Sequence, residues 1–373
     1  MSQPAPMRSH LSRLYELAKI AYGSIPATLS RDGYAFPARH FLLELTRRCN
    51  LRCKMCQYID FLENTPVRQQ KEGELSTEEW RAVLDQIPRF SLVSFTGGEL
   101  FVRPDFMELL RLACARTRTH FITNATMVTG EVADGIVALA PRHIGFRGVN
   151  VICVSIDGPP ETHDRIRRIR DGFERTTQGL RAMRAARDAA GKKCPHLVVT
   201  TVIQEDNVRE LHLLPPLFRE MGADVVNFVP ETRMLDLPGF GERDPRSYTR
   251  DEIIRPRIDP QVLREALERA EAAAAKAGIA LRLPRMPRED LIHYYSGGMD
   301  LDGYRCSMPW NGYAVGCKGE IYSCWSYPLG NVRNMSLKEV WLGERARAFR
   351  GMCRKGAFEF CPGCCLVEKE GYH

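Results

Sequence analysis

Six short segments rich in β-branched and other apolar residues recur along the first 230 residues, and this alternation is the strongest constraint on the fold. The predicted buried strands cover residues 41–46, 92–96, 120–124, 149–157, 197–203 and 225–229. Stretches with helical periodicity lie between several of them, at residues 76–87, 104–116, 173–190 and 207–221. Alternating strands and helices predict a parallel sheet, either a partial barrel or an open doubly wound sheet. In both, functional groups gather at the carboxyl ends of the strands.

The composition changes after the last predicted strand. Residues 233–260 are rich in Pro, Gly, Arg and Asp and predict an ordered loop or hinge, which an Ala- and Glu-rich helix follows over residues 260–277. From residue 301 onward the chain carries seven of its 13 cysteines. We therefore expect an N-terminal helical extension with an amphipathic stretch at 11–22, a core, a loop and helix connector, and a small Cys-rich domain. These parts cover residues 1–37, 38–232, 233–300 and 301–373.

The 13 cysteines indicate metal chemistry rather than disulfides. An odd number argues against complete pairing, and the chain begins without a secretory signal, so we expect a cytoplasmic protein with reduced thiols. No apolar run reaches the roughly 18 residues of a membrane span, and none is expected. The net charge of +7 comes from scattered basic residues without interleaved aromatics, so we expect no nucleic-acid partner.

Three cysteines stand close together directly after the first predicted strand. Cys49, Cys53 and Cys56 form a C-x3-C-x2-C run. Three thiolates on one loop can hold three irons of a [4Fe–4S] cluster and leave the fourth iron open to another ligand. A zinc site is the alternative, but zinc favours paired C-x2-C elements with a fourth ligand, and no nearby histidine supplies one.

Within Leu45–Cys53, this run resembles the cluster motif of the radical S-adenosylmethionine (SAM) enzymes, although Met55 replaces the aromatic residue that most members carry. Gly97, Gly98 and Glu99, at the end of the second predicted strand, are similar to the GGE motif of that family. The resemblance implies that the glycines let the backbone approach the methionine part of SAM and that Glu99 accepts a hydrogen bond from its ammonium group. An ordinary turn is the alternative for these three residues alone.

Two further strand ends resemble SAM-binding segments of the family. Ser155 ends the fourth predicted strand and Arg167 follows it, as in the peptide- and sulfatase-modifying branch, which implies that both bind the methionine carboxylate. Asn124 ends the third strand and matches the usual Asn-Gly only in part, because alanine follows it, so the resemblance implies a supporting role. For Asp157 and His163 we expect hydrogen bonds within the local turn rather than catalysis.

The tail carries a second group of cysteines. Cys306 and Cys324, followed by the C-x2-C pair Cys361 and Cys364, supply enough thiolates for one complete cluster. The pattern resembles the SPASM and twitch extensions of radical SAM enzymes, which hold auxiliary iron–sulfur clusters. Because only Cys365 follows the last pair, the resemblance favours the twitch form with one auxiliary [4Fe–4S] cluster, and a full SPASM domain with two is the alternative.

The remaining cysteines have no assigned ligand role. Cys317, Cys353 and Cys365 could each replace a ligand or donate a hydrogen atom to a substrate radical, and packing or simple exposure is the interpretation that we favour for each. The other three are expected to be small buried apolar groups: Cys114, Cys153 and Cys194.

The resemblance implies both a fold and a chemistry. The fold is α/β, a partial (β/α)6 TIM-like barrel followed by a small Cys-rich twitch or SPASM domain. The chemistry is reductive cleavage of SAM to a 5′-deoxyadenosyl radical, which abstracts a hydrogen atom from the substrate, with electrons from a flavodoxin- or ferredoxin-type donor. An auxiliary cluster that accepts an electron favours oxidation or dehydrogenation, whereas epimerisation requires a hydrogen donor.

The substrate is less constrained than the chemistry. Peptide-modifying relatives often carry an N-terminal peptide-recognition domain, for which the first 37 residues are too short, so we expect a small biosynthetic intermediate such as a sugar or aminocyclitol. A peptide-modifying maturase is the alternative. Outside catalysis, the alternative is an iron–sulfur electron-transfer or interaction protein, against which the GGE, Ser155 and Arg167 matches argue. The basic loop over residues 243–257 could contact an anionic substrate, but a solvated loop is the interpretation that we favour.

Overall fold

The computed structural model describes residues 21–371, and its main feature is one sheet of ten strands in the order β11-β10-β9-β1-β2-β3-β4-β5-β6-β7. Strands β1 to β6 are parallel neighbours in chain order. Their bounds are β1 His40–Thr46, β2 Leu92–Gly97, β3 Arg118–Thr123, β4 Gly148–Ser155, β5 His196–Ile203 and β6 Val225–Pro230. The six predicted strands are therefore confirmed, with ends that differ by a few residues.

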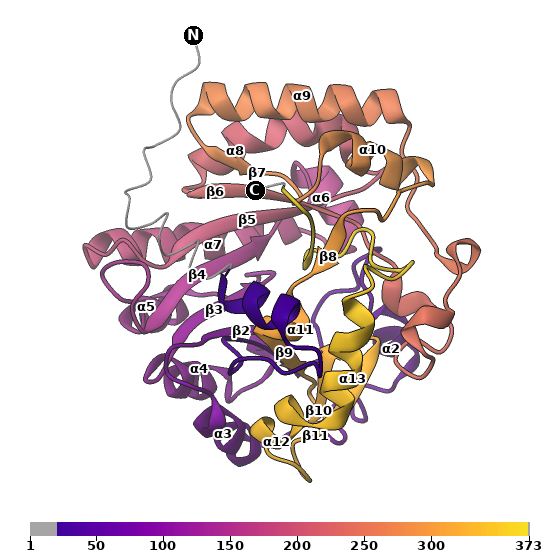
Figure 1. Cartoon of the computed structure of the whole chain (residues 1–373). Helices are drawn as coiled ribbons and strands as arrows, with labels where there is room; N and C mark the ends of the chain where they lie inside the picture. Colours follow the sequence, from indigo (N-terminus) through magenta and orange to yellow (C-terminus); the bar gives the residue numbers. More distant parts are fainter. Residues whose placement is uncertain (1–20, 372–373) are drawn as a thin grey trace.

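Helices lie along the outside of this curved sheet, from α3 at the lower left of Figure 1 to α9 at the top. Their bounds are α2 Ile59–Asn64, α3 Thr77–Gln86, α4 Phe106–Cys114, α5 Gly130–Ala138, α6 Pro160–Arg167, α7 Gly172–Ala189, α8 Leu214–Glu220, α9 Pro260–Ala277 and α10 Arg288–Ser296. Parallel strands with helices between them confirm the predicted α/β partial barrel. The helices α5 and α6 were not predicted.

One predicted helix is divided in the structure. The stretch at 207–221 forms a 3₁₀ segment, Val208–Leu213, and then the separate helix α8. The division falls at Pro215 and Pro216, which have no backbone N–H and are therefore tolerated only in the first turn of a helix. The capping sequence before α3 is confirmed, because Ser76 Oγ accepts a hydrogen bond from Glu79 N at 3.2 Å and Glu79 accepts one from Ser76 N at 2.8 Å.

The Cys-rich tail adds strands to the core sheet. Strand β9 (Gly312–Val315) is parallel to β1, and the antiparallel strands β10 (Glu320–Cys324) and β11 (Tyr327–Asn331) continue the sheet outward. A second, two-stranded sheet joins β8 (Tyr304–Cys306) to β12 (Val367–Lys369). The tail helices are α11 Met308–Asn311, α12 Leu337–Leu342 and α13 Glu344–Cys353, and they lie at the front of Figure 1.

Aromatic packing joins the tail to β1. The ring of Phe41, on β1, lies edge-on to the ring of Tyr313 with centroids 5.1 Å apart, and Tyr313 in turn packs against Trp341 at 5.3 Å. All three side chains are buried. Burial of one such side chain contributes about 1.5–3 kcal/mol, so this contact fixes the tail against the barrel.

The connector before the tail extends the opposite edge of the sheet. Residues 231–259 are irregular, with short 3₁₀ segments at Met234–Asp236, Pro245–Ser247 and Arg250–Glu252. The short strand β7 (Ala280–Arg282) is parallel to β6. At the N-terminus, residues 21–29 are helical, and most of the predicted amphipathic stretch, residues 11–20, lies outside the described residues. Within residues 21–371 no helix is long and apolar enough to cross a lipid bilayer.

Candidate functional site

The C-x3-C-x2-C run lies on the loop that leaves the carboxyl end of β1, and residues 49–56 are called the cluster loop below. Cys53 is buried, Cys49 and Cys56 are half-buried, and all three are free thiols. In residues 21–371 no three His, Cys, Asp or Glu side chains converge closely enough to hold a single metal ion. The surroundings of the three sulfur atoms then decide whether a cluster fits.

Hydrogen-bond donors surround these sulfur atoms. The backbone N–H of Leu51 donates to Cys49 Sγ at 3.4 Å, and that of Tyr58 donates to Cys56 Sγ at 3.4 Å. Donors of this kind stabilise the thiolates that bind iron–sulfur clusters. Burial raises the pKa of Cys49 to about 12, so this thiol remains protonated until a metal binds. Three soft sulfur ligands with backbone donors fit three corners of a [4Fe–4S] cluster.

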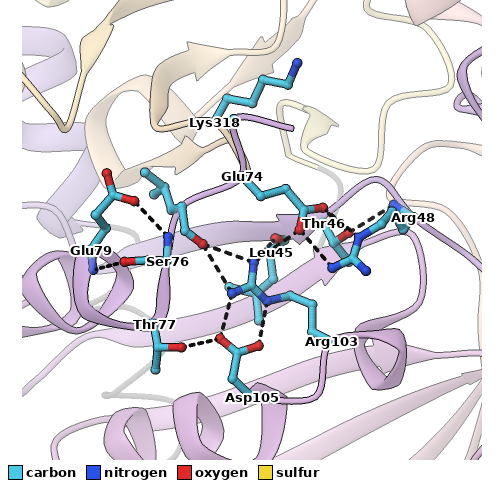
Figure 2. Close-up of polar contacts among 12 residues, drawn as sticks. Leu45, Thr46, Arg48, Glu74, Ser76, Thr77, Glu79, Arg103, Asp105 and Lys318 are labelled. Atoms are coloured by element: carbon cyan, nitrogen blue, oxygen red, sulfur yellow. Dashed lines mark hydrogen bonds and ion pairs between the residues drawn. The ribbon is translucent and has the colours of Figure 1, made fainter. Parts of the chain in front are cut away.

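A largely buried polar network fastens the end of β1 to the segment before α3 (Figure 2). Glu74 accepts hydrogen bonds from Thr46 Oγ1 at 2.5 Å and from Arg48 Nη2 at 2.9 Å. Arg103 donates to the carbonyl oxygen of Leu45 at 3.1 Å and lies 3.5 Å from the Glu74 carboxylate. This network fixes the position where the cluster loop begins. Sequence analysis missed both Glu74 and Arg103, because a lone acid and a lone base in separate loops give no local pattern.

The two glycines of the GGE motif pack against the backbone of residues 46–48, which lead into the cluster loop. A Cβ on Gly97 would lie 2.1 Å from the carbonyl oxygen of Thr46, and a Cβ on Gly98 would lie 2.1 Å from that of Arg48. The N–H of Gly98 donates to the Thr46 carbonyl at 2.8 Å. Glycine is therefore required here for close approach of two backbones. The sequence analysis explained these glycines by approach to SAM, a contact that stays a prediction.

Glu99 joins the ends of three strands. It is 1% exposed, and its carboxylate accepts hydrogen bonds from Thr123 Oγ1 at 2.8 Å and from Asn124 N at 2.8 Å. Burial raises the pKa of Glu99, and these hydrogen bonds oppose the rise. Asn124 donates from Nδ2 to Asn50 Oδ1, on the cluster loop, at 2.9 Å. Phe101 N also donates to Glu99, at 3.3 Å, and because a carboxylate has about four acceptor sites, one remains for a further donor.

Arg167 reaches the cluster loop from the end of α6. Its Nε donates to Asp157 Oδ2 at 2.6 Å, and its Nη1 donates to Cys53 Sγ at 3.7 Å. Although burial acts to lower it, the Asp157 carboxylate raises the pKa of Arg167 above its ordinary value. The predicted local turn is present, because Asp157 N donates to His163 Nδ1 at 3.2 Å, but Asp157 also orients Arg167. Ser155 is half-buried at the last residue of β4.

The tail brings five cysteines together. Cys306 ends β8, Cys324 ends β10, and Cys361 and Cys364 lie in the last loop, where a backbone N–H donates to Cys361 Sγ at 3.2 Å. Cys353, at the end of α13, is 6% exposed and lies near Cys306, Cys324 and Cys361. Burial and these neighbouring thiols raise its pKa. The sequence analysis left Cys353 unassigned, because it stands alone in the chain and only the fold brings it to the others.

Cys317 lies apart from this tail group. It follows β9, is 2% exposed, and has Glu44 and Arg47 of the β1 region as its neighbours. Burial raises its pKa to about 12, so it is a neutral thiol. Cys365 is exposed and interacts with the adjacent Cys364. Of the three cysteines left unassigned, Cys317 therefore lies beside the end of β1, whereas Cys353 and Cys365 lie with the other tail cysteines.

A buried acid on β1 was also missed. Glu44 is 1% exposed, accepts a hydrogen bond from Tyr58 Oη at 2.5 Å and pairs with Arg47 Nε at 3.3 Å. Burial raises the pKa of Glu44. The signal was present in the sequence, because Glu44 interrupts the apolar run at 41–45 of a predicted buried strand.

The three cysteines predicted to be packing residues differ in their surroundings. Cys114 and Cys194 are 7% and 0% exposed and lie in the apolar core, as predicted. Cys153 is half-buried, and its Sγ lies 3.2 Å from His120 Nε2, so it is not surrounded by apolar groups alone.

Comparison with known proteins adds to this geometry. The sequence matches the Radical SAM superfamily over residues 43–213 and SPASM, an iron-sulfur cluster-binding domain, over residues 306–365. The AdoMet-dependent heme synthase of Methanosarcina barkeri (strain Fusaro / DSM 804) is 28% identical over 86% of this chain and 89% of its own length. The tungsten-containing aldehyde ferredoxin oxidoreductase cofactor-modifying protein of Pyrococcus furiosus is 25% identical over 88% of this chain and 87% of its own length.

A solved structure shows the same fold. The crystal structure of Streptococcus suis SuiB bound to precursor peptide SuiA superposes with a TM-score of 0.60 at 15% identity, covering 93% of this chain and 74% of SuiB. The two family matches include both cysteine regions and the GGE motif. The chain is thus a radical SAM enzyme with a C-terminal SPASM-type domain, and its cofactors are SAM, a [4Fe–4S] cluster and at least one auxiliary iron–sulfur cluster.

Proposed function

We propose that this enzyme oxidises a small biosynthetic molecule by radical chemistry between two iron–sulfur sites. The SAM-cleaving cluster is assigned to Cys49, Cys53 and Cys56, and one auxiliary [4Fe–4S] cluster to Cys306, Cys324, Cys361 and Cys364. When bound, the first cluster and SAM supply a 5′-deoxyadenosyl radical that abstracts a hydrogen atom from the substrate. Loss of a proton and of a second electron from the substrate radical would complete a two-electron oxidation, and the four tail cysteines would hold the cluster that takes up that electron.

The observation that carries this proposal is that the cluster loop contacts the segment after β5, and the tail loop reaches the segment after β6 through Tyr294 of α10. Lys54, on the cluster loop, pairs with Asp206, after β5, at 3.1 Å. In the tail, Gly363 of the C-x2-C pair packs on Tyr294, because a Cβ there would lie 2.5 Å from Tyr294 Oη. The Tyr294 hydroxyl donates to the carbonyl oxygen of Glu231, after β6, at 2.6 Å. A substrate at these strand ends therefore lies beside both cysteine loops.

The chain's own residues position the reacting groups. Arg167, held by Asp157, is assigned to orient Cys53 and to face the SAM carboxylate together with Ser155. Glu99 is assigned to the SAM ammonium through its remaining acceptor capacity, with Asn124 in a supporting role. Because three strand ends hold these groups, the site is fixed before SAM binds.

The names of the sequence relatives support a small substrate, whereas their length does not decide it, because anSMEcpe, whose structure holds the Cp18Cys peptide, is matched over 92% of its own chain. The sequence relatives matched over 87–89% of their own length are named for heme synthesis and for modification of a cofactor. SuiB, whose structure holds a precursor peptide, is matched over 74% of its length. Peptide modification is the second candidate, because SuiB shares the fold.

Substitution of Cys317 can distinguish an oxidation from an epimerisation. It is the neutral buried thiol on the β1 side of the molecule, beside Glu44 and Arg47, away from the tail cysteines. If the reaction is redox-neutral, Cys317 is the hydrogen donor that we assign, and Cys317→Ala abolishes transfer of solvent deuterium to the product. Under the oxidative reaction, Cys317→Ala leaves the product unchanged.

Iron counting and nucleoside release test the proposal together. Anaerobically reconstituted protein should hold about eight irons, and a Cys49/Cys53/Cys56→Ala variant about four fewer. The matched control is Cys114→Ala, which removes a buried thiol from the apolar core and should retain all iron. With dithionite and SAM the wild type should release 5′-deoxyadenosine, and Glu99→Ala should release little. Bound zinc, or no nucleoside under any reducing condition, would overturn the proposal in favour of an electron-transfer or interaction protein.

A further inference from the structure

A cavity of about 320 Å³ lies at the carboxyl ends of β5 and β6. Residues that follow both strands line it, together with Lys54 of the cluster loop and the segment 254–257. Its backbone is fixed, because Tyr295 Oη donates to the carbonyl oxygen of Ile203 at 2.7 Å and accepts from Glu231 N at 2.9 Å. The cavity thus occupies strand ends that the cluster loop contacts directly and that the tail loop reaches through Tyr294.

The charged side chains around this cavity are unequally paired. Lys54 pairs with Asp206 at 3.1 Å, and Arg233 pairs with Glu231 at 2.9 Å. Within residues 21–371, neither Arg255 nor Arg257, the two remaining basic residues of the lining, has an ion-pair partner within 4.0 Å. The unpaired charge of the lining is therefore mainly positive, although the exposed carboxylate of Glu205 also lines it.

Arg255 is the more unusual of the two. Its Nη1 donates to the carbonyl oxygen of Gly297 at 3.2 Å, but its Nε and Nη2 are buried without a hydrogen-bond partner among the described residues. Glu359 lies near enough to act on the pKa of Arg255, and its Oε2, 3.5 Å from Arg250 Nε, is itself buried without a hydrogen-bond partner among the described residues. Buried donors without acceptors carry a desolvation cost, which an acceptor bound in the cavity would offset.

We infer that this cavity binds an anionic group of the substrate, a carboxylate or a phosphate, with Arg255 as its main ligand and Arg257 beside it. The planar guanidinium of Arg255 presents two donors side by side, which is the geometry that carboxylates and phosphates accept. Because Arg255 lines the cavity, an anion bound there would lie beside its guanidinium group. The inference rests on the proposed function, because it names the substrate class of that site. It also gives the basic loop over residues 243–257 a role in substrate binding, whereas the sequence favoured a solvated loop there.

Anion binding to the reconstituted enzyme tests this inference directly. Isothermal titration with succinate and, separately, with inorganic phosphate should detect binding at low ionic strength, and the tighter anion indicates whether the substrate carries carboxylates or phosphates. Arg255→Gln should weaken that binding by at least about ten-fold, and Arg255→Lys by less, because lysine keeps the charge but not the fork. Arg257→Gln, at an exposed position, should also weaken it without affecting folding.

The controls separate this inference from the proposed function. Arg111→Gln removes an exposed arginine from α4 and should leave anion binding unchanged. Iron content and 5′-deoxyadenosine release without substrate should stay at wild-type values in the Arg255 and Arg257 variants. Absence of binding by both anions, or binding that neither cavity variant weakens, would overturn the inference even if SAM is cleaved normally. Loss of SAM cleavage in the wild type would instead overturn the proposed function.

Discussion

The two cysteine regions are built in different ways. The cluster loop follows β1 directly, and its position depends on backbone contacts, such as the hydrogen bond from Glu99 N to the Arg48 carbonyl at 2.9 Å. The tail cysteines are spread over residues 306–365 and meet only because side chains pack around them. Stacked rings, for example Tyr327 on Phe349 at 4.7 Å, hold the elements that carry them.

This difference indicates where each region is vulnerable. A loop held by backbone contacts tolerates changes of exposed side chains but not a Cβ placed between two backbones. A site assembled by tertiary packing tolerates changes in its loops but not loss of a central buried side chain. Substitutions that disturb only the backbone contacts of the cluster loop, or only the side-chain packing of the tail, can therefore test each region separately.

The largest effect is expected for Arg350→Met in the tail. Arg350 is 0% exposed and donates to the carbonyl oxygens of Pro309, Gly33 and Trp341 at 2.7–3.1 Å. Methionine leaves these buried acceptors unpaired, so the free energy of unfolding should fall by about 3–5 kcal/mol. Denaturant titration measures the loss, and iron counting should show that the tail loses its cluster while the cluster loop retains its own.

The control for this variant is Arg345→Met on the same helix. Arg345 is exposed, donates to the carbonyl oxygen of Pro328 and lies over the Tyr327 ring at 5.4 Å, so the change in stability should be below about 1 kcal/mol. Equal destabilisation by the two variants would contradict the central role of Arg350. Parallel loss of iron from both regions would contradict the separation of the two regions.

The next effect is expected for Gly98→Ala beside the cluster loop. The added Cβ would lie 2.1 Å from the carbonyl oxygen of Arg48, and a backbone atom cannot give way cheaply. The strain should cost on the order of 3 kcal/mol and displace the loop, so iron bound there and 5′-deoxyadenosine release should both be lost. Gly130→Ala, where a Cβ meets nothing within 4 Å, is the matched control and should retain both.

The same contrast explains how far the sequence could predict the site. The cluster loop, GGE motif and strand ends are local patterns, and the alternation of apolar segments located the barrel strands that carry them. Cys353 could not be assigned from the sequence, because its closeness to Cys306 depends on how α13 packs in the tail. The division of residues 207–221 into two helical segments could have been predicted from Pro215 and Pro216. The prediction of one helix gave more weight to the helical periodicity of the stretch than to these two prolines.

Buried polar partners were the other limit of sequence prediction. The dual role of Asp157, which orients Arg167 and caps the local turn, arises from residues of two elements that only the fold brings together. Glu74 and Arg103 likewise act across loops. A single sequence contains the charged residues but not their pairing, because each pair forms through tertiary contacts.

A smaller effect is expected for Arg167→Lys. Lysine cannot bond Asp157 and Cys53 at once, so one charge-assisted hydrogen bond of about 2 kcal/mol should be lost. The initial rate of 5′-deoxyadenosine release should fall by roughly thirty-fold, and the electron paramagnetic resonance signal of the reduced cluster should shift. The neighbouring Arg168→Lys, at an exposed residue that pairs with Glu63, should change neither. Identical rates for the two variants would show that Arg167 does not act on the loop.

The smallest expected effect is on the pH dependence of stability, which we expect to arise from histidines of the barrel rather than of the tail. The segment from residue 294 to 372 contains no histidine, whereas His163, beside Asp157, is 1% exposed in the barrel. Burial, with Arg167 nearby, lowers the pKa of His163 to about 3. Below about pH 6.5 the unfolded chain therefore binds a proton at this residue that the folded protein does not, and stability falls as the pH decreases.

The substitution His163→Asn should reduce this acid sensitivity. The asparagine side chain keeps an acceptor for Asp157 N, but it cannot titrate. Between pH 7 and pH 5.5 the variant should lose about 1 kcal/mol less unfolding free energy than the wild type, measured by urea titration of the anaerobic protein. His143→Asn, at an exposed residue, should follow the wild type. Since His40 and His120, whose pKa values burial lowers to about 4, add to the same slope, part of the acid sensitivity should remain and should originate in the barrel.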